Sequence, residues 1–183
     1  MENSKKEIRV CSYFSPCGKL FLGEFDGKLC LCDWENSRLH ARNGKSVRHF
    51  FKADFSENYS SVLHKATMQL DEYFAGERRV FSVPVILIGT DFQNRVWKAL
   101  SAIAYGQTES YATFATLLGM PKGIRAVAQA VGANKLSIII PCHRVIGTDG
   151  SLTGFAGGLE AKRFLLEKEQ GNKTKRSFGN DFS

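Results

Sequence analysis

The sequence has no long run of apolar residues. No stretch of its 183 residues approaches the roughly 20 consecutive apolar residues that a transmembrane helix requires. The first ten residues, MENSKKEIRV, also lack the apolar core of a secretory signal. We therefore expect no membrane association and an intracellular protein, which would be cytoplasmic, or nuclear if the source is a eukaryote.

The sequence also lacks an even set of cysteines and a common zinc-ligand spacing. Its five cysteines cannot all pair, and in a reducing compartment they are expected to be free thiols or ligands. Cys30 and Cys32 are separated by one residue, which is not a usual zinc knuckle. Buried thiols that fill a small core fit this spacing better than zinc ligands. We predict no metal and no cofactor, which leaves room for one reactive cysteine.

The composition is that of a globular protein with a basic second half. Apolar residues make up 43% of the chain and charged residues 23%, and this length allows one large domain or two small ones. Residues 1–88 carry 13 basic and 11 acidic side chains, a net charge of +2, whereas residues 89–183 carry 12 and 7, a net charge of +5. The excess fits a polyanionic partner and a solvated basic surface equally well.

The first half predicts a small sheet and one helix. Residues 11–34 alternate apolar and polar side chains and are broken at Pro16-Cys17-Gly18 and at Asp26-Gly27, a strong hairpin signal. Residues 61–74 carry apolar side chains at helical spacing, and Gly76 would end that helix. Residues 35–48 form a polar stretch. Residues 80–88 predict a strand or an extended connector, and we place the domain boundary at its end.

The second half predicts several helices. One begins at Thr90 or Asp91, either of which can cap it, and ends at Tyr105-Gly106. Two short helices, 111–118 and 123–131, surround a turn that contains Gly119, the outline of a helix-turn-helix. An ordinary helical hairpin has the same outline. Residues 137–140 predict a short strand or extended run, and residues 158–169 a last helix.

Together these patterns predict an α+β fold. Residues 1–88 would form a small N-terminal α/β scaffold domain, with a short sheet packed on one helix. Residues 89–170 would form a mostly helical C-terminal domain that contains the helix-turn-helix. Residues 171–183 are predicted to be a disordered tail.

Cys142 is the candidate nucleophile. A cysteine reacts as the thiolate, so it needs a basic or cationic neighbour to lower its pKa, and His143 and Arg144 follow it directly. In an extended chain adjacent side chains point to opposite faces, so a turn or a water would have to connect His143 to the sulfur. From these three residues alone, a buried structural cysteine is an equal alternative.

The surrounding sequence resembles a known family. Residues 138–158, IIIPCHRVIGTDGSLTGFAGG, closely resemble the active-site signature of the O6-alkylguanine-DNA alkyltransferases, also called methylated-DNA-protein cysteine methyltransferases. The likeness extends through GTDFQNRVWKAL, AYGQTESYATFATLLGMPKGIRAV, Asn134 and LEAKRFLLEKE. It spans nearly all of the second half without gaps, whereas the first half resembles the family only loosely, in SPCGKL and YFAGE.

The resemblance implies DNA repair by single-use alkyl transfer. Cys142 would take the alkyl group from O6-alkylguanine in double-stranded DNA, with O4-alkylthymine as a further candidate substrate, after minor-groove binding and base flipping. His143 would be the base, acting through a water, and Glu169 would orient it. The implied protein is a monomer whose alkyltransferase and DNA-binding domain is residues 89–170.

The resemblance also assigns binding residues. Tyr111 would help to turn the nucleotide out and hydrogen-bond guanine, Arg125 would enter the space that the base leaves, and Asn134 would stabilise the turn before the active site. Val145, Phe155 and Ala156 would contact the substrate. Phe155 departs from the family, which usually has a tyrosine there, so a hydroxyl hydrogen bond to the base would be lost.

Two readings from other classes remain. A non-catalytic damage-recognition protein would flip alkylguanine and recruit other factors, but such relatives lack the cysteine that this chain has. A transcription regulator would use Cys142 as an alkylation sensor and would need to read bases, and the alanine-rich second helix offers few side chains for that.

Overall fold

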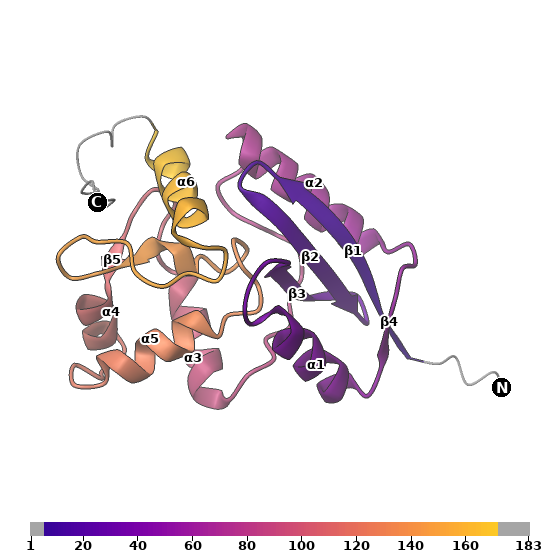
Figure 1. Cartoon of the computed structure of the whole chain (residues 1–183), viewed down its shortest axis with the longest axis horizontal. Coiled ribbons are helices and arrows are strands. Elements are labelled where there is room, and N and C mark those ends of the chain that lie inside the picture. Colours follow the sequence, from indigo (N-terminus) through magenta and orange to yellow (C-terminus); the bar gives the residue numbers. More distant parts are fainter. Residues whose placement is uncertain (1–5, 172–183) are drawn as a thin grey trace. The chain divides into compact units, whose positions relative to one another are not determined.

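The computed structural model describes residues 6–171 (Figure 1). The chain divides into two compact units between Ile88 and Gly89. The predicted tail at 171–183 lies outside the described residues, apart from Gly171, at which the last helix is capped. Within the described part of the chain, no helix is both long and apolar enough to cross a membrane.

The first unit is built on a four-stranded sheet with strand order β3-β2-β1-β4. Two antiparallel hairpins join β1, β2 and β3, and β4 lies parallel to β1. Both predicted turns are present, and Asp26 and Gly27 have the positive φ values, 49° and 77°, of a two-residue hairpin turn. The strands are β1 (Glu7–Ser15), β2 (Gly18–Phe25), β3 (Lys28–Trp34) and β4 (Asp54–Ser56).

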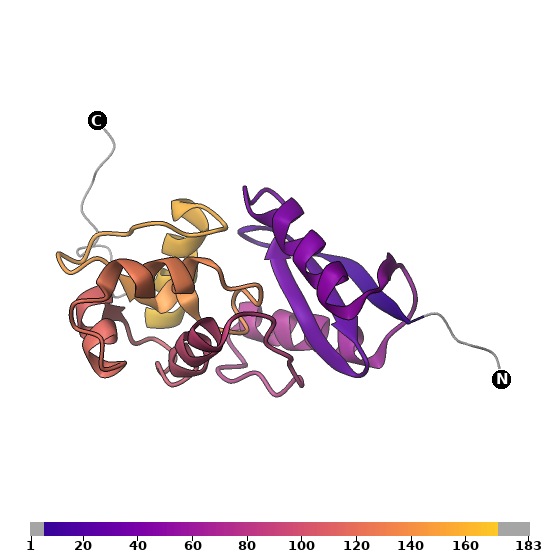
Figure 2. The same ribbon diagram turned by 90° about the horizontal axis from the view of Figure 1, so that it is seen from below.

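A helix covers each face of this sheet (Figures 1 and 2). Alternate residues of β1 point to opposite faces. Ile8 and Val10 pack in a core cluster with Val47 of α1 (His40–Phe51), whereas the Tyr13 hydroxyl donates to Asp71 of α2 (Ser61–Ala75) at 2.8 Å. A sheet buried on both faces explains why nearly all of β3 is buried.

The expectation of a single helix in this unit was wrong. Helix α1 begins within the stretch interpreted as polar, where Asn43 and Gly44 are poor helix formers. Tertiary contacts stabilise the helix instead. Asn43 is buried and donates to the buried Asp33 carboxylate at 3.0 Å. A side chain at Gly44 would meet the Phe55 ring at 3.4 Å, so glycine allows the close approach.

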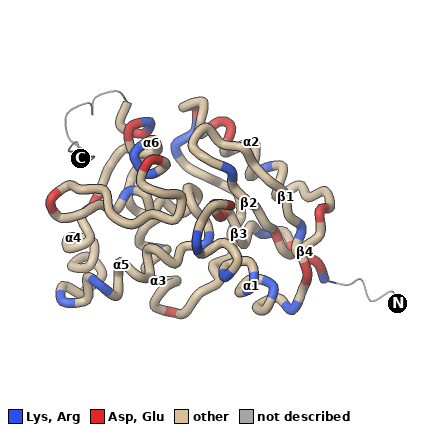
Figure 3. The backbone as a smooth tube through the Cα atoms, in the orientation of Figure 1, with Lys and Arg blue, Asp and Glu red and all other residues tan. Residues whose placement is uncertain are grey.

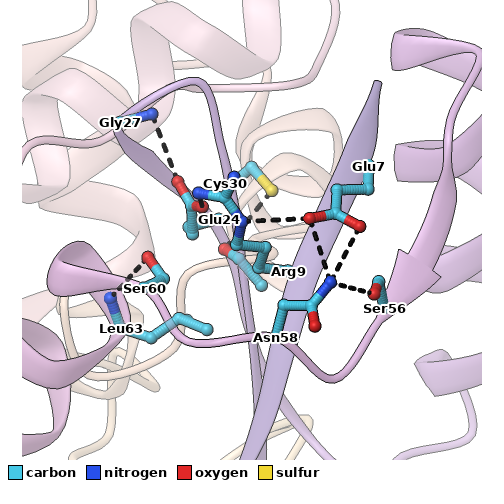
Figure 4. A network of polar contacts seen from close by, with 10 residues as sticks. Glu7, Arg9, Glu24, Gly27, Cys30, Ser56, Asn58, Ser60 and Leu63 are labelled. Carbon is cyan, nitrogen blue, oxygen red and sulfur yellow. Dashed lines mark hydrogen bonds and ion pairs between the residues drawn. The ribbon is translucent and has the colours of Figure 1, made fainter. Parts of the chain in front are cut away.

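A network of polar contacts joins β1 to β2 and to the segment after β4 (Figure 4). Arg9 lies between two carboxylates, donating to Glu7 at 3.2 Å and to the buried Glu24 at 3.1 Å. Asn58, which follows β4, donates to both oxygens of Glu7 at 3.1 and 3.0 Å. The buried Glu24 is thus paired, and the segment after β4 is held against the sheet.

The second unit is mostly helical, which confirms the predicted α+β fold. Its elements are α3 (Asp91–Leu100), β5 (Glu109–Ser110), α4 (Tyr111–Leu117), α5 (Ile124–Gly132), the 3-10 helix η1 (Cys142–Arg144), β6 (Val145–Ile146) and α6 (Leu159–Gln170). Thr90 caps α3 in a reciprocal capping box with Gln93. Helix α3 ends at Leu100 and not at Tyr105-Gly106 as expected, and residues 137–140 form a tight turn rather than a strand.

Helices α4 and α5 have the predicted helix-turn-helix outline. Gly119 has a φ of 74°, a left-handed value that glycine adopts without strain, where the chain leaves α4. The indole Nε1 of Trp97, on α3, donates to the carbonyl of Ala130, on α5, at 2.8 Å. This bond and the burial of Val127 and Val131 fix α5 on α3.

Candidate active site

A turn organised by Asn134 leads from α5 to Cys142. The buried Asn134 side chain accepts from the Leu136 amide at 2.9 Å and donates to the Ile140 carbonyl at 3.0 Å. The same Nδ2 lies 3.2 Å from Cys142 Sγ. Ile138 has a φ of 69°, a rare value for a β-branched residue. The turn therefore holds the thiol in place at some cost in backbone strain.

The Cys142 thiol is neutral at rest. Only 6% of the residue is exposed, and burial raises the pKa of the thiol above its ordinary value. The Asn134 hydrogen bond, the Lys162 charge and the amides of Cys142 and His143 act in the opposite direction but do not compensate. Because the thiolate is the nucleophile, the site needs a group that accepts the thiol proton.

Glu169, on α6, is a buried carboxylate with four hydrogen bonds. It accepts from His143 Nε2 at 2.7 Å, from Arg144 Nε at 2.8 Å and Nη2 at 3.1 Å, and from the Gly106 amide at 3.2 Å. Burial alone would raise the pKa of Glu169, but the hydrogen bonds and charges of His143 and Arg144 outweigh it and lower the pKa well below its ordinary value. The carboxylate stays ionised.

His143 is fully buried, and one of its ring nitrogens is free. Burial lowers the pKa of His143, with the positive charges of Arg144 and Lys162 adding to the effect against the pull of Glu169, so the ring is neutral at pH 7. An ionised Glu169 requires the ring hydrogen on Nε2. Nδ1 is then an acceptor, and it has no hydrogen-bond partner among the described residues. The edge of the ring faces Phe155, with centroids 6.5 Å apart.

Lys162, on α6, is a residue that the sequence analysis did not single out. It is completely buried, and its Nζ donates to the carbonyls of Val145 at 2.6 Å and Thr153 at 2.9 Å. Burial lowers its pKa to about 8, whereas a negative charge on Cys142, present only in the thiolate form, would raise it. Its spacing in the sequence could have indicated this burial. Lys162 lies at helical spacing from Leu165, Leu166 and Glu169, with which it shares the buried face of α6.

The other predicted site residues are at least half-buried, with the exception of the exposed Arg125. Tyr111, the first residue of α4, lies against Lys162, whose Nζ is 5.9 Å from the centroid of the Tyr111 ring. Burial raises the pKa of its hydroxyl, and Cys142 adds to that effect. Val145 is buried next to η1, and Phe155 and Ala156 are half-buried in the loop before α6. Arg125 is exposed on α5.

The exposed face of α5 consists mostly of small and polar residues. Its side chains point away from the buried Val127, Ala130 and Val131, and the exposed residues are Ile124, Arg125, Ala126, Gln129 and Gly132. Small side chains allow another backbone to approach the helix closely. This face can therefore lie against a flat or grooved surface.

A buried thiol beside a carboxylate-held imidazole, in a unit with a helix-turn-helix, defines a DNA-binding protein with a nucleophilic cysteine. Residues 8–87 match the ribonuclease-like domain of 6-O-methylguanine DNA methyltransferases, and residues 91–171 match their DNA-binding domain. The chain belongs to the 6-O-methylguanine DNA methyltransferase family.

Individual relatives cover most of the chain. The methylated-DNA-protein-cysteine methyltransferase of Methanosarcina barkeri is 45% identical over 73% of this chain and 90% of its own length. That of Haemophilus influenzae is 44% identical over 86% of this chain and 84% of its own length. The structure of Mycobacterium tuberculosis OGT in complex with DNA superposes with a TM-score of 0.75 at 40% identity, covering 90% of this chain and 92% of that one.

The buried charge of Lys162 gives a first prediction. Below pH 8 the ammonium is present and favours the thiolate of Cys142, so Lys162→Gln should lower the thiolate fraction, and with it the alkylation rate, in that pH range. The rate of Cys142 alkylation by iodoacetamide, followed against pH, measures this change. Lys98→Gln removes an exposed lysine of the same unit and should leave the profile in place. An unchanged profile in Lys162→Gln would contradict the electrostatic coupling.

Proposed function

We propose that this protein repairs double-stranded DNA by transferring an alkyl group from O6 of guanine to the sulfur of Cys142. One observation carries the proposal. The buried thiol, the acceptor nitrogen of His143 and the ionised Glu169 form a nucleophile, base and orienting group within the unit that carries the helix-turn-helix. The family to which the chain belongs supplies the substrate class.

The proton path follows from the tautomer of His143. A water between the two side chains would take the thiol proton of Cys142 and pass one to His143 Nδ1, while Glu169 stabilises the imidazolium through Nε2. The thiolate then attacks the alkyl carbon, the bond from that carbon to guanine O6 breaks, and its electron pair leaves with the guanine. The released guanine takes up a proton, which balances the proton lost by the thiol, and a thioether remains on Cys142.

Such a reaction consumes the protein. The thioether is chemically stable, and the chemistry described here includes no step that would regenerate the thiol. Each molecule therefore acts once, and repair is stoichiometric. The chain needs no cofactor for a displacement in which the thiolate is the nucleophile and guanine the leaving group.

DNA binding is assigned to the helix-turn-helix. The exposed face of α5, with Ala126 and Gly132, would lie in the minor groove, whose degenerate pattern of base edges suits a protein that must act at any sequence. The target base must leave the stack, because its O6 substituent is out of reach of a protein thiol inside the duplex. Arg125 would occupy the vacated space.

The flipped base would lie against the residues around Cys142. We assign Tyr111 as the hydrogen-bond donor to guanine when negative charge develops on the leaving base. Val145, Phe155 and Ala156 would line the pocket, and Asn134 would hold the turn that presents the thiol. With DNA as the substrate, the protein would be placed in the cytoplasm of a prokaryote or the nucleus of a eukaryote.

The proposal is tested by intact-protein mass spectrometry after incubation with a duplex that carries one O6-methylguanine. The wild-type protein should gain one methyl group, and Cys142→Ser should gain none. Tight binding to the lesion without a mass change would point to a damage-recognition protein. Preference for one DNA sequence without a lesion would point to a regulator.

Glu169→Gln should slow alkyl transfer and leave DNA affinity unchanged. An amide removes the negative charge that stabilises the imidazolium, so the single-turnover rate should fall on the order of a hundredfold, at the lower end of the range of general acid-base effects. Single-turnover transfer and equilibrium DNA binding measure the two effects. Glu167→Gln, an exposed change on the same helix, is the control. A normal transfer rate in Glu169→Gln would disprove the orienting role.

Arg125→Ala should separate the reaction in DNA from the reaction with a free base. If Arg125 fills the space left by the flipped base, its loss should slow methyl transfer from duplex DNA on the order of tenfold. Benzyl transfer from free O6-benzylguanine should keep its rate, because that substrate needs no flipping. Equal losses on both substrates would remove the extrahelical role of Arg125.

A further inference from the structure

Helix α1 of the first unit has a cationic solvent face. From Asn36 to Ala53 the chain contains no acidic residue. In and next to α1, the exposed basic side chains are Arg42, Lys45, Arg48, His49 and Lys52. Figure 3 shows basic positions along the helix and at its end. This charge belongs to the unit that was expected to be only a scaffold.

The basic residues form one stripe. At about 100° per residue, Arg42, Lys45, His49 and Lys52 fall on one side of the helix, and Arg48 lies next to them. The opposite side carries the buried residues Asn43, Gly44 and Val47, which pack on the sheet. The exposed charged side chains of the helix therefore lie on the side away from the sheet and have one sign of charge.

The stability of the helix does not account for this pattern. Arg48 and His49 lie in the last turn, where a cation favours the helix dipole. Arg42 lies in the first turn, where a cation opposes the dipole. A solvated helix face usually alternates charges so that residues three or four apart attract each other, whereas here Arg42, Lys45 and Arg48 repel one another. An external anion would remove that repulsion.

We infer that the α1 face binds the phosphate backbone of duplex DNA. The choice of DNA rests on the proposed function, which already brings this polyanion to the protein. The ten steps from Arg42 to Lys52 rise about 15 Å along a helix, which matches four to five phosphates at about 3.4 Å per strand step. The face presents point charges and no array of base-reading amides, so its binding would be independent of sequence.

Such a contact adds affinity for any duplex, damaged or not. Each lysine or arginine that neutralises a phosphate releases a condensed counterion, so the contribution appears in the salt dependence of binding. Undamaged DNA greatly outnumbers lesions. A contact with undamaged DNA would keep the protein on the duplex between lesions.

The test compares two double variants of the full chain. Arg42→Gln/Lys45→Gln removes two charges from the α1 face, and Lys28→Gln/Lys65→Gln removes two exposed charges elsewhere in the same unit. Affinity for a lesion-free duplex is measured by fluorescence anisotropy over a range of salt concentrations. The α1 variant should lower the slope of log affinity against log salt by about 1 to 2. At low salt its affinity should fall on the order of tenfold, and the control should match the wild type.

Other outcomes overturn the inference. Equal losses in both variants would reflect total charge only, and no loss in the α1 variant would mean that DNA does not contact this face. Lost binding to phosphatidylserine vesicles without a change in DNA binding would assign the face to lipid. Benzyl transfer from free O6-benzylguanine should be the same in all three proteins. If the wild type transfers no benzyl group, the proposed function fails, and the salt slopes still decide the role of α1.

Discussion

The second unit depends on the hydrogen bonds that the buried carboxylate of Glu169 accepts. This carboxylate joins three segments that are distant in sequence, since it binds His143 and Arg144 of η1 and the Gly106 amide from the loop after α3. Arg144 extends the junction to the Ile103 carbonyl at 2.6 Å. A buried charge is tolerated only when partners saturate it, so removal of one member leaves another unpaired at a cost of about 3 to 5 kcal/mol. The same carboxylate therefore stabilises the fold and fixes the base.

The protonation states follow from that arrangement. Burial keeps the Cys142 thiol and the His143 ring neutral, whereas the partners of Glu169 keep it ionised. Before reaction, the site thus contains a buried, neutral thiol and a His143 ring whose orientation Glu169 already fixes. In the proposed reaction, one proton transfer would convert these two groups into a thiolate and an imidazolium paired with a carboxylate. Lys162 adds a positive charge where the thiolate forms.

Local signals allowed much of the fold to be predicted from the sequence. Hairpin turns, the cap at Thr90 and the glycine after α2 depend on neighbouring residues, and the structure has them in place. Helix α1 was missed because its stability comes from tertiary contacts such as Asn43 with Asp33. The site was harder to predict from the sequence for the same reason. His143 and Glu169 are 26 positions apart, and only the family resemblance linked them, while Lys162 appeared as an ordinary helix lysine.

We infer that Glu169 holds His143 in the tautomer whose Nδ1 can accept a proton. The most direct test is ¹⁵N NMR of histidine-labelled protein at neutral pH, where the chain has four histidines and His143→Gln assigns the signal. We predict a protonated, pyrrole-type Nε2 and an unprotonated, pyridine-type Nδ1 at His143. A hydrogen on Nδ1 in the resting protein, in the neutral or the doubly protonated ring, would contradict the account.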